Sequence, residues 1–326
     1  MLRVVCALLL SAFSLSSLAV DDVWLLLQKT AYAARELNYQ GVFVYQNIKQ
    51  TSSVQITHMN NNGQEMTRNV VLDNGVQTGQ SREVYSQGSN IVIFRPQSQK
   101  MVIEKRRGQN LFPAMLPTEL QAIKASYTAR LGALEYVAGR EAQIIELIPN
   151  DAFRYSYKIW TDTEYGLLLK MALLNSKKQT LEQVAFSQID MLYSQDVNWF
   201  QPKIDVSKNY VMEDATTVNH VESNWIVTEL PAGYSKVDHI ALVVPGKAAP
   251  VDQMIFSDGI ASVSLFIEPL TKGMHPKMGH MLIGSTNICA NVIDGYQITV
   301  VGEVPEATVM QIAKAVSFKK QTVSNK

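Results

Sequence analysis

The sequence predicts an α+β fold in two domains, each with an antiparallel sheet and few helices. Short runs that alternate apolar and polar residues recur along most of the chain, and turn signals separate them, as in a series of hairpins. Segments with helical spacing are rare by comparison. The chain of 326 residues is also longer than one hydrophobic core usually organises. We therefore expect a larger N-terminal unit and a smaller C-terminal unit.

The N-terminus has the features of a cleaved secretory signal. Arg3 precedes a short apolar run, and Ser17-Leu18-Ala19 provides the small residues of a cleavage site just before Asp21. The run is too short and too rich in serine to be typical of a membrane span, although a retained anchor is the alternative. We expect an exported protein whose signal peptide is cleaved near Ala19.

Composition argues against nucleic acid or an anionic membrane as a partner, and against an internal disulfide. The 29 basic and 29 acidic residues give a net charge of zero, which offers no electrostatic basis for binding nucleic acid or a strongly anionic membrane. Cys6 leaves with the signal, so Cys289 is the sole cysteine of the mature chain and cannot form an internal disulfide. Its apolar neighbours indicate a buried, unreactive thiol.

The first hundred residues predict a helix followed by an antiparallel meander. An amphipathic helix over residues 22–37 has its apolar side chains at helical spacing. These residues are Val23, Trp24, Leu27, Ala31, Ala34 and Leu37. Strands are expected over residues 41–45, 53–59, 82–85, 90–95 and 100–105, with hairpin turns at 60–63 and 73–75.

A second helix is predicted to interrupt the sheet. Thr118 and Gln121 have the spacing of a capping box, in which the threonine is the N-cap. The helix face would then hold Leu120, Ile123, Tyr127 and Leu131. The preceding segment, residues 111–117, is apolar but contains two prolines, which exclude a regular strand interior. It is either a loop packed against the core or a mobile lid over an apolar cavity.

The segment from Gly139 to Leu174 predicts consecutive strands of a sheet that wraps and binds. Turn signals follow at 149–151 and 162–166, and a further strand is expected over 181–191. In the middle strand, one face carries Tyr155, Tyr157 and Ile159, and the other carries Arg154, Lys158 and Trp160. Alternation alone leaves open which of the two faces points inward.

Regular alternation fades between residues 202 and 221, which predicts a linker. Beyond it, strands are expected over 225–230, 239–244, 261–267, 288–293 and 296–303. Pro305 then begins a last helix whose apolar face holds Val309, Ile312, Ala313 and Val316. The second domain is therefore predicted to be a small antiparallel sheet with one helix.

The sequence contains no arrangement typical of catalysis. It has no serine on a tight strand-to-helix turn, no paired carboxylates at catalytic spacing, no HExxH helix and no glycine-rich phosphate loop. His275 and His280, with the methionines of residues 274–281, are the nearest approach to a soft metal site, but glycine and proline there favour an ordinary turn. We predict a binding protein, not an enzyme, with no cofactor and no metal.

Several blocks, in order along nearly the whole chain, resemble the MucB/RseB family of periplasmic regulators. The blocks are Tyr39-Gln40-Gly41-Val42-Phe43-Val44-Tyr45, Ala138-Gly139-Arg140, Arg154-Tyr155-Ser156-Tyr157-Lys158-Ile159-Trp160, Gly166-Leu167-Leu168-Leu169-Lys170, residues 258–268 and Val300-Val301-Gly302-Glu303-Val304-Pro305.

The resemblance implies an N-terminal antiparallel half-barrel curled over helices, similar to the periplasmic lipoprotein carriers and with an apolar hollow. It also implies a smaller C-terminal α+β domain that contributes most to partner docking. The resulting division is a signal peptide over 1–19, a sensor domain over 20–204, a linker over 205–222, a partner-binding domain over 223–319 and a tail over 320–326.

The implied function is regulation in the periplasm. Such a protein binds the periplasmic part of a membrane anti-sigma factor, shields it from regulated proteolysis, and releases it on sensing lipid or mislocalised lipoprotein. As candidate lining of the hollow we select Val42, Val44, Ile56, Phe112, Met115, Leu116, Tyr155, Tyr157 and Leu168, although ordinary core packing must explain about half of them. As candidate partner contacts we select the aromatic Phe266 and Tyr296 with the charged Asp258 and Glu268.

Two other functions stay open. A periplasmic lipid or lipoprotein carrier without a regulatory role would transfer cargo and leave anti-sigma cleavage unaffected. An exported hydrolase would lose activity on changing one polar residue, and the sequence offers no residue for that test. The oligomeric state is also open, and a homo-oligomer is one option.

Overall fold

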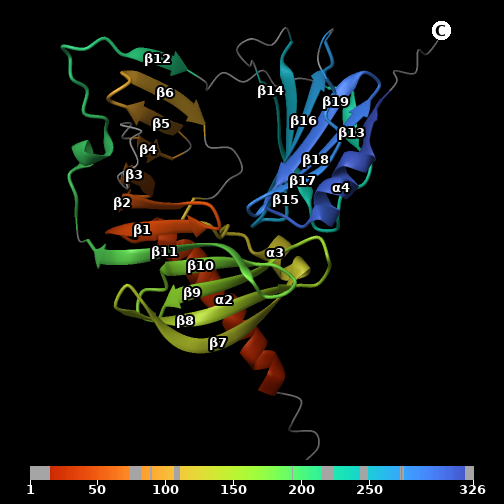
Figure 1. Cartoon of the computed structure of the whole chain (residues 1–326). Helices are drawn as coiled ribbons and strands as arrows, with labels where there is room; N and C mark the ends of the chain where they lie inside the picture. Colours follow the sequence, from red (N-terminus) through yellow and green to blue (C-terminus); the bar gives the residue numbers. More distant parts are fainter. Residues whose placement is uncertain are drawn as a thin grey trace, which may run out of the picture.

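The computed structural model describes residues 15–72, 82–88, 90–105, 111–192, 194–214, 223–242, 249–271, 273 and 275–319. They form two domains, each with its own main sheet and hydrophobic core (Figure 1). The predicted α+β class and two-domain architecture are confirmed. The turn predicted at residues 73–75 lies outside the described residues.

The N-terminal domain is a curled sheet of twelve strands that does not close into a barrel. Its order is β12-β6-β5-β4-β3-β2-β1-β11-β10-β9-β8-β7. The strands are β1 (Tyr39–Asn47), β2 (Thr51–Asn61), β3 (Gln64–Leu72), β4 (Glu83–Gln87), β5 (Asn90–Arg95), β6 (Lys100–Lys105), β7 (Tyr127–Val137), β8 (Arg140–Pro149), β9 (Ser156–Asp162), β10 (Leu168–Leu174), β11 (Thr180–Met191) and β12 (Val211–Asp214). Hairpins join most neighbours, so the predicted meander is confirmed.

Helix α2 (Leu15–Glu36) crosses the sheet and contacts strands β2, β7 and β10, and its N-terminal end extends past β7 (Figure 1). Its predicted apolar face is confirmed: Val23, Trp24, Leu27, Ala31 and Ala34 are buried in the main core. Thr30 adds a polar contact, because its hydroxyl lies 3.1 Å from that of Thr161 on β9. Apolar periodicity thus places this helix on the inner side of the sheet.

The second helix is much shorter than predicted. Helix α3 covers only Gln121–Ser126, no side chain caps its start, and its preceding residue is Leu120, so the capping box at Thr118 is wrong. Tyr127 instead begins β7, which pairs along its length with β8. Long-range pairing with β8 and the burial of Tyr127 in the core thus take precedence over the helical spacing of Tyr127 and Leu131.

The predicted linker contains one strand of the N-terminal sheet. After a short 3-10 helix, η1 (Val197–Phe200), the chain returns to the sheet edge, where Val211–Asp214 pairs in parallel with β6 as β12. Lys100 and Glu213 form an ion pair of 2.7 Å across this edge. The described part of the connection between the domains therefore runs along the far edge of the half-barrel.

The C-terminal domain is a six-stranded antiparallel sheet with one helix packed on it. Its order is β14-β15-β16-β19-β18-β17, beside a two-stranded sheet of β13 and β20. The elements are β13 (Trp225–Val227), β14 (Ser235–Leu242), β15 (Val251–Ser257), β16 (Ser262–Pro269), β17 (Gly279–Ile283), β18 (Thr286–Ile293), β19 (Tyr296–Gly302), α4 (Glu306–Ala315) and β20 (Val316–Phe318). Strands β15, β17 and β20 were not predicted from the sequence. The predicted apolar face of the last helix is confirmed for Val309, Ile312 and Ala313, which are buried on α4. Val316 is also buried, but it begins β20 and not the helix, because it pairs with Val227 of β13.

Candidate functional site

The apolar interior of the half-barrel is packed by aromatic rings from two strands and one loop. Phe43 on β1 and Phe186 on β11 point into the core, and Phe112 of the proline-containing loop lies 5.0 Å from each, measured between ring centroids. Phe112 and Leu116 are both buried. The loop of residues 111–117 therefore packs Phe112 and Leu116 into the core of the half-barrel.

The predicted lining residues fall into two groups. Ile56, Phe112, Leu116, Tyr157 and Leu168 belong to one buried cluster, and Met115 and Tyr155 pack against it. Val42 and Val44 are half-buried and alternate with Phe43, so they lie on the other face of β1. Whether any of these residues contacts a ligand stays a prediction.

Sequence reasoning missed Phe43 and Phe186 as members of the interior. Phe43 stands between Val42 and Val44, the two valines that were predicted to line the hollow. The strand was therefore predicted, but the residues chosen on it lie on the face opposite Phe43. The register of β1 and β11 shifts between Val42 and Phe43. The extra residue is Ser187 of β11, so β1 keeps its alternation, and which of its two faces is buried depends on the elements that pack against it.

On β9 the structure decides which face is inward. Tyr157, Ile159 and Thr161 are buried toward the core. Trp160 is on the opposite face and is buried as well, because the side chains of Lys158 and Lys170 cover it, with their ammonium groups 4.8 and 4.5 Å from its ring. The inward face is thus the one that carries Tyr157.

The two domains meet at a fully buried ion pair. Arg154, just before β9, donates from Nε to Asp258 of the C-terminal domain at 2.8 Å, and neither side chain is exposed to solvent. Arg154 also bonds to Asp151 and to the carbonyl oxygen of Ala232, and its guanidinium lies 4.9 Å from the ring of Tyr234. A buried guanidinium with this many partners fixes the domains in one relative position.

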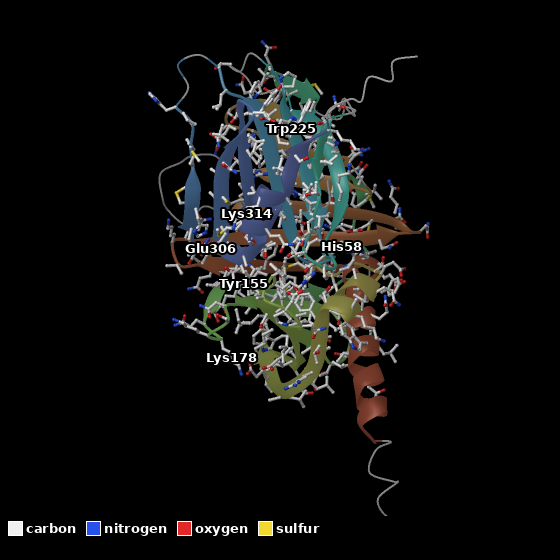
Figure 2. The ribbon with its side chains drawn as sticks, turned by 90° about the vertical axis from the view of Figure 1, so that its right-hand side faces the viewer. His58, Tyr155, Lys178, Trp225, Glu306 and Lys314 are labelled. Atoms are coloured by element: carbon white, nitrogen blue, oxygen red, sulfur yellow. The ribbon has the colours of Figure 1, made fainter. Side chains whose placement is uncertain are left out.

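Further hydrogen bonds extend the junction along both sides of the ion pair. The carbonyl oxygen of Phe153 accepts from Thr308 of α4 at 2.7 Å and from Tyr234 at 3.3 Å. Asn287 of β18 donates to the hydroxyl of Tyr155 at 3.1 Å. Figure 2 shows Tyr155 at the domain boundary with Glu306 of α4 close above it, whereas Trp225 lies far from the boundary.

A groove of about 520 Å³ opens beside this junction. Phe153 is the part of its wall that belongs to the N-terminal domain, and α4 with the segment after β13 forms the rest. The lining residues are Phe153, Thr228, Glu229, Ala307, Met310, Gln311, Lys314 and Ala315. Figure 2 shows Lys314 on the helix above the boundary. The groove combines apolar surface with one charge of each sign, which suits an amphipathic peptide segment.

The predicted partner contacts are dispersed. Asp258 is fully buried in the ion pair with Arg154 and accepts from the backbone of Ile260 and Ala261, so its side chain has intramolecular partners. Tyr296 packs against Trp225, with ring centroids 5.1 Å apart. Phe266 and Glu268 are half-buried on one face of β16. A contact of any of these with another protein stays a prediction.

The described part of the chain offers no metal centre, since no three His, Cys, Asp or Glu side chains come together there. Of the two histidines considered for a metal, His280 instead bonds to Asn287 at 2.6 Å and faces Glu306 at 3.5 Å. Cys289 is unpaired and half-buried against the C-terminal core, and burial raises the pKa of its thiol. Within the described residues, no helix is both long enough and apolar enough to cross a membrane.

Comparison with known proteins places both domains in one family. The family model described as the MucB/RseB N-terminal domain matches residues 22–204, and that of the MucB/RseB C-terminal domain matches residues 219–317. The sigma-E factor regulatory protein RseB of Escherichia coli K12 is 25% identical over 307 residues, which cover 94% of each chain.

Two Pseudomonas aeruginosa comparisons agree with this result. The sigma factor AlgU regulatory protein MucB of strain PAO1 is 28% identical over 303 residues, which cover 89% of each chain. The solved complex of MucA and MucB contains a chain that is 26% identical, with a TM-score of 0.72, and the match covers 92% of this chain and 99% of that one.

Proposed function

This chain belongs to the MucB/RseB family, and on that premise we propose that it is a periplasmic regulator of an envelope stress response. It binds the periplasmic segment of a membrane anti-sigma factor and shields that segment from regulated proteolysis. Lipid, or the acyl chains of mislocalised lipoprotein, releases it. The observation that carries the proposal is the match of both domains, in order, to a relative whose solved complex contains MucA.

We propose that the partner segment occupies the groove between Phe153 and α4. A segment seated there contacts both domains at once, so its affinity depends on their relative position. Met310 provides an apolar contact, and Glu229 and Lys314 at the groove can pair with charges on the segment. The C-terminal domain supplies most of this surface.

Release requires that the ligand prefer the partner-free conformation, because a ligand with equal affinity for both conformations shifts nothing. Strand β9 and the residues just before it provide a physical connection between the two sites. Tyr157 is buried in the apolar core, whereas Arg154 and Tyr155 bond to the C-terminal domain. An acyl chain that displaces Phe112 from the core would disturb this strand and therefore the junction.

The test is proteolysis of the anti-sigma factor's periplasmic segment by the protease that cleaves it. The segment should be cleaved more slowly with this protein present, and addition of a lipid with acyl chains should restore the rate. Met310→Glu should abolish the protection, whereas Val237→Glu, on an exposed part of β14, should not. Unchanged cleavage with the wild-type protein would refute the proposal, and cargo transfer without protection would favour a carrier.

A further inference from the structure

Strand β17 is an edge strand that the fold leaves uncovered. It is the last strand of the C-terminal sheet and pairs with β18 on one side only (Figure 1). All five of its residues are exposed. Met281, Leu282 and Ile283 are 53%, 57% and 43% exposed, and by alternation they lie on both faces of the strand. Neighbouring apolar side chains that are this exposed are typical of a contact site.

The other edges of the two main sheets carry features that hinder pairing with a further strand. The ladder of β7 with β8 shifts register after Leu131, and that of β14 with β15 shifts after Lys236. On β12, Glu213 forms an ion pair with Lys100. Bulges, charges and prolines are the usual protection of an edge. Among the described edges of these sheets, β17 is the one without them, since its pairing with β18 is regular and it has no proline, lysine, arginine, aspartate or glutamate.

The hairpin shows which backbone groups an added strand would bond to. A two-residue turn, 284–285, joins β17 to β18, so Ile283 and Thr286 form the hydrogen-bonded pair next to the turn. Hydrogen-bonded and non-hydrogen-bonded pairs alternate along an antiparallel ladder. The backbone N–H and C=O groups of His280 and Leu282 therefore point away from β18, toward the uncovered side.

This edge is held in place at both ends. Before the strand, the side-chain amide of Gln297 accepts from the backbone N–H of Lys277 and donates to its C=O, each at 2.8 Å. After the strand, the hydroxyl of Ser285 donates to Glu182 of the half-barrel at 2.8 Å. An edge that is already ordered loses little conformational entropy when another strand pairs with it.

We propose that β17 binds an extended segment of the partner by strand addition, so that the segment extends the six-stranded sheet at this edge. The proposal rests on the proposed function for the identity of the partner. The edge adjoins the proposed groove at the start of α4. There Glu306 lies 3.5 Å from His280 of β17, and the next residue, Ala307, lines the groove. One segment can therefore occupy the groove and then the edge.

The surroundings of the edge favour an apolar segment with an acidic residue at one end. Alternate side chains of such a segment pack beside Met281 on one face and Leu282 on the other. Residues 275–283 contain no aspartate or glutamate. Lys277 is exposed, and none of the ion pairs of the described residues involves it. A carboxylate on the segment therefore complements this end of the edge.

A single extended chain suits this place better than a second copy of the protein. The chain needs only the strand spacing of about 4.8 Å beside β17. A second copy would also bring its own half-barrel, which Ser285 holds against the tip of the same hairpin.

The test measures binding of the partner's periplasmic segment, carrying a fluorescent label, to the full mature chain by anisotropy. Leu282→Pro removes an outward N–H and places its ring where the added strand would lie, but it leaves the bonds to β18 intact. Its affinity for the segment should fall at least about tenfold. Leu282→Ala keeps the N–H and is the matched control, with an expected loss of about threefold. Equal urea midpoints of the two variants would show that the hairpin stays folded.

Charge and amide exchange give two further readouts. Lys277→Glu should weaken binding severalfold at low salt and less at high salt, because salt screens an exposed charge. In the wild type, exchange of the His280 and Leu282 amides should slow when the segment binds. Exchange of the Met281 amide should change much less, since it is already bonded to β18.

The outcomes separate strand addition from the groove. Equal affinities of Leu282→Pro and Leu282→Ala, or no protection of the two outward amides, would overturn strand addition. Loss of binding in Met310→Glu would then leave the groove as the site of the partner. A change in self-association alone, seen by sedimentation of Leu282→Pro, would assign the edge to a second copy and also overturn the proposal. A wild-type chain that does not bind the segment would refute the proposed function itself.

Discussion

At Gly41, the backbone of a neighbouring strand leaves no room for a side chain. A Cβ added there would lie 2.4 Å from the carbonyl oxygen of Gln188 and 3.1 Å from the ring of Phe186. Gly41 sits next to the register shift between β1 and β11, so β11 approaches it closely. This glycine therefore helps to place Phe186 in the aromatic interior.

At the residue scale, Gly41→Ala should lower the free energy of unfolding by about 2–3 kcal/mol, because the added methyl group overlaps backbone that cannot move without breaking the ladder. Urea unfolding measures the change. Gly63→Ala is the matched control: its φ is +88° but nothing lies within 4 Å of the added atom. It should lose only about 1 kcal/mol to backbone strain. Equal losses in the two variants would contradict the steric explanation.

The loop of residues 111–117 is the element whose apolar side chains fill part of the interior of the half-barrel. Its prolines keep it out of the sheet, and its apolar side chains then pack between strands and helix. Sequence analysis left a packed loop and a mobile lid as alternatives. The structure shows the packed arrangement, in which Phe112 contacts both Phe43 and Phe186. We therefore predict that a ligand would compete with this loop for the interior.

Truncation of the loop's aromatic anchor should have two opposite effects. Phe112→Ala should destabilise the protein by about 3–5 kcal/mol through the loss of buried contacts and the cavity left behind. The same cavity should strengthen binding of a fluorescent fatty acid severalfold, as read by titration. Leu111→Ala, whose side chain is 45% exposed, should change neither quantity. Weaker fatty-acid binding by folded Phe112→Ala would show that Phe112 is a ligand contact rather than a competitor.

At the scale of the whole molecule, the two domains are joined by interactions of different character. The Arg154–Asp258 pair is fully buried, and Gly233 at a φ of +81° lets the turn before Tyr234 approach Arg154 closely. The hydrogen bond that Ser285 of the β17–β18 turn donates to Glu182 of β11, 2.8 Å long, is only part-buried. The buried pair, with the further bonds of Arg154 to Asp151 and Ala232, therefore contributes more to the relative position of the domains.

Asp258→Asn should cost about 3 kcal/mol or more, because it leaves the buried Arg154 guanidinium with Asp151 as its remaining carboxylate partner. The loss should appear as a lower urea midpoint and as faster amide exchange on both sides of the junction. Asp294→Asn removes the same charge from an exposed turn and should have no measurable effect. A variant that is unchanged in stability would mean that the pair does not hold the domains together.

Local patterns in the sequence were sufficient for the strands of the meander, the apolar faces of α2 and α4, and the two-domain α+β class. They were sufficient because apolar periodicity and turn residues act over a few neighbouring positions. The short range of that information explains what was missed. The helix predicted to continue through Tyr127 became β7, and β12 formed inside the predicted linker, because distant strands offered backbone partners.

The sequence by itself therefore determined the family, the class of fold and the absence of a recognisable catalytic motif. Only the tertiary structure decided that Tyr157 and Trp160 are both buried although they lie on opposite faces of β9, that Phe43 rather than its neighbouring valines is buried in the core, and that Asp258 meets Arg154 across the domain boundary. The physical reason is the same in each case. Alternation and residue type define two faces and a set of charges, but which face is buried and which charges meet depends on elements far apart in the chain.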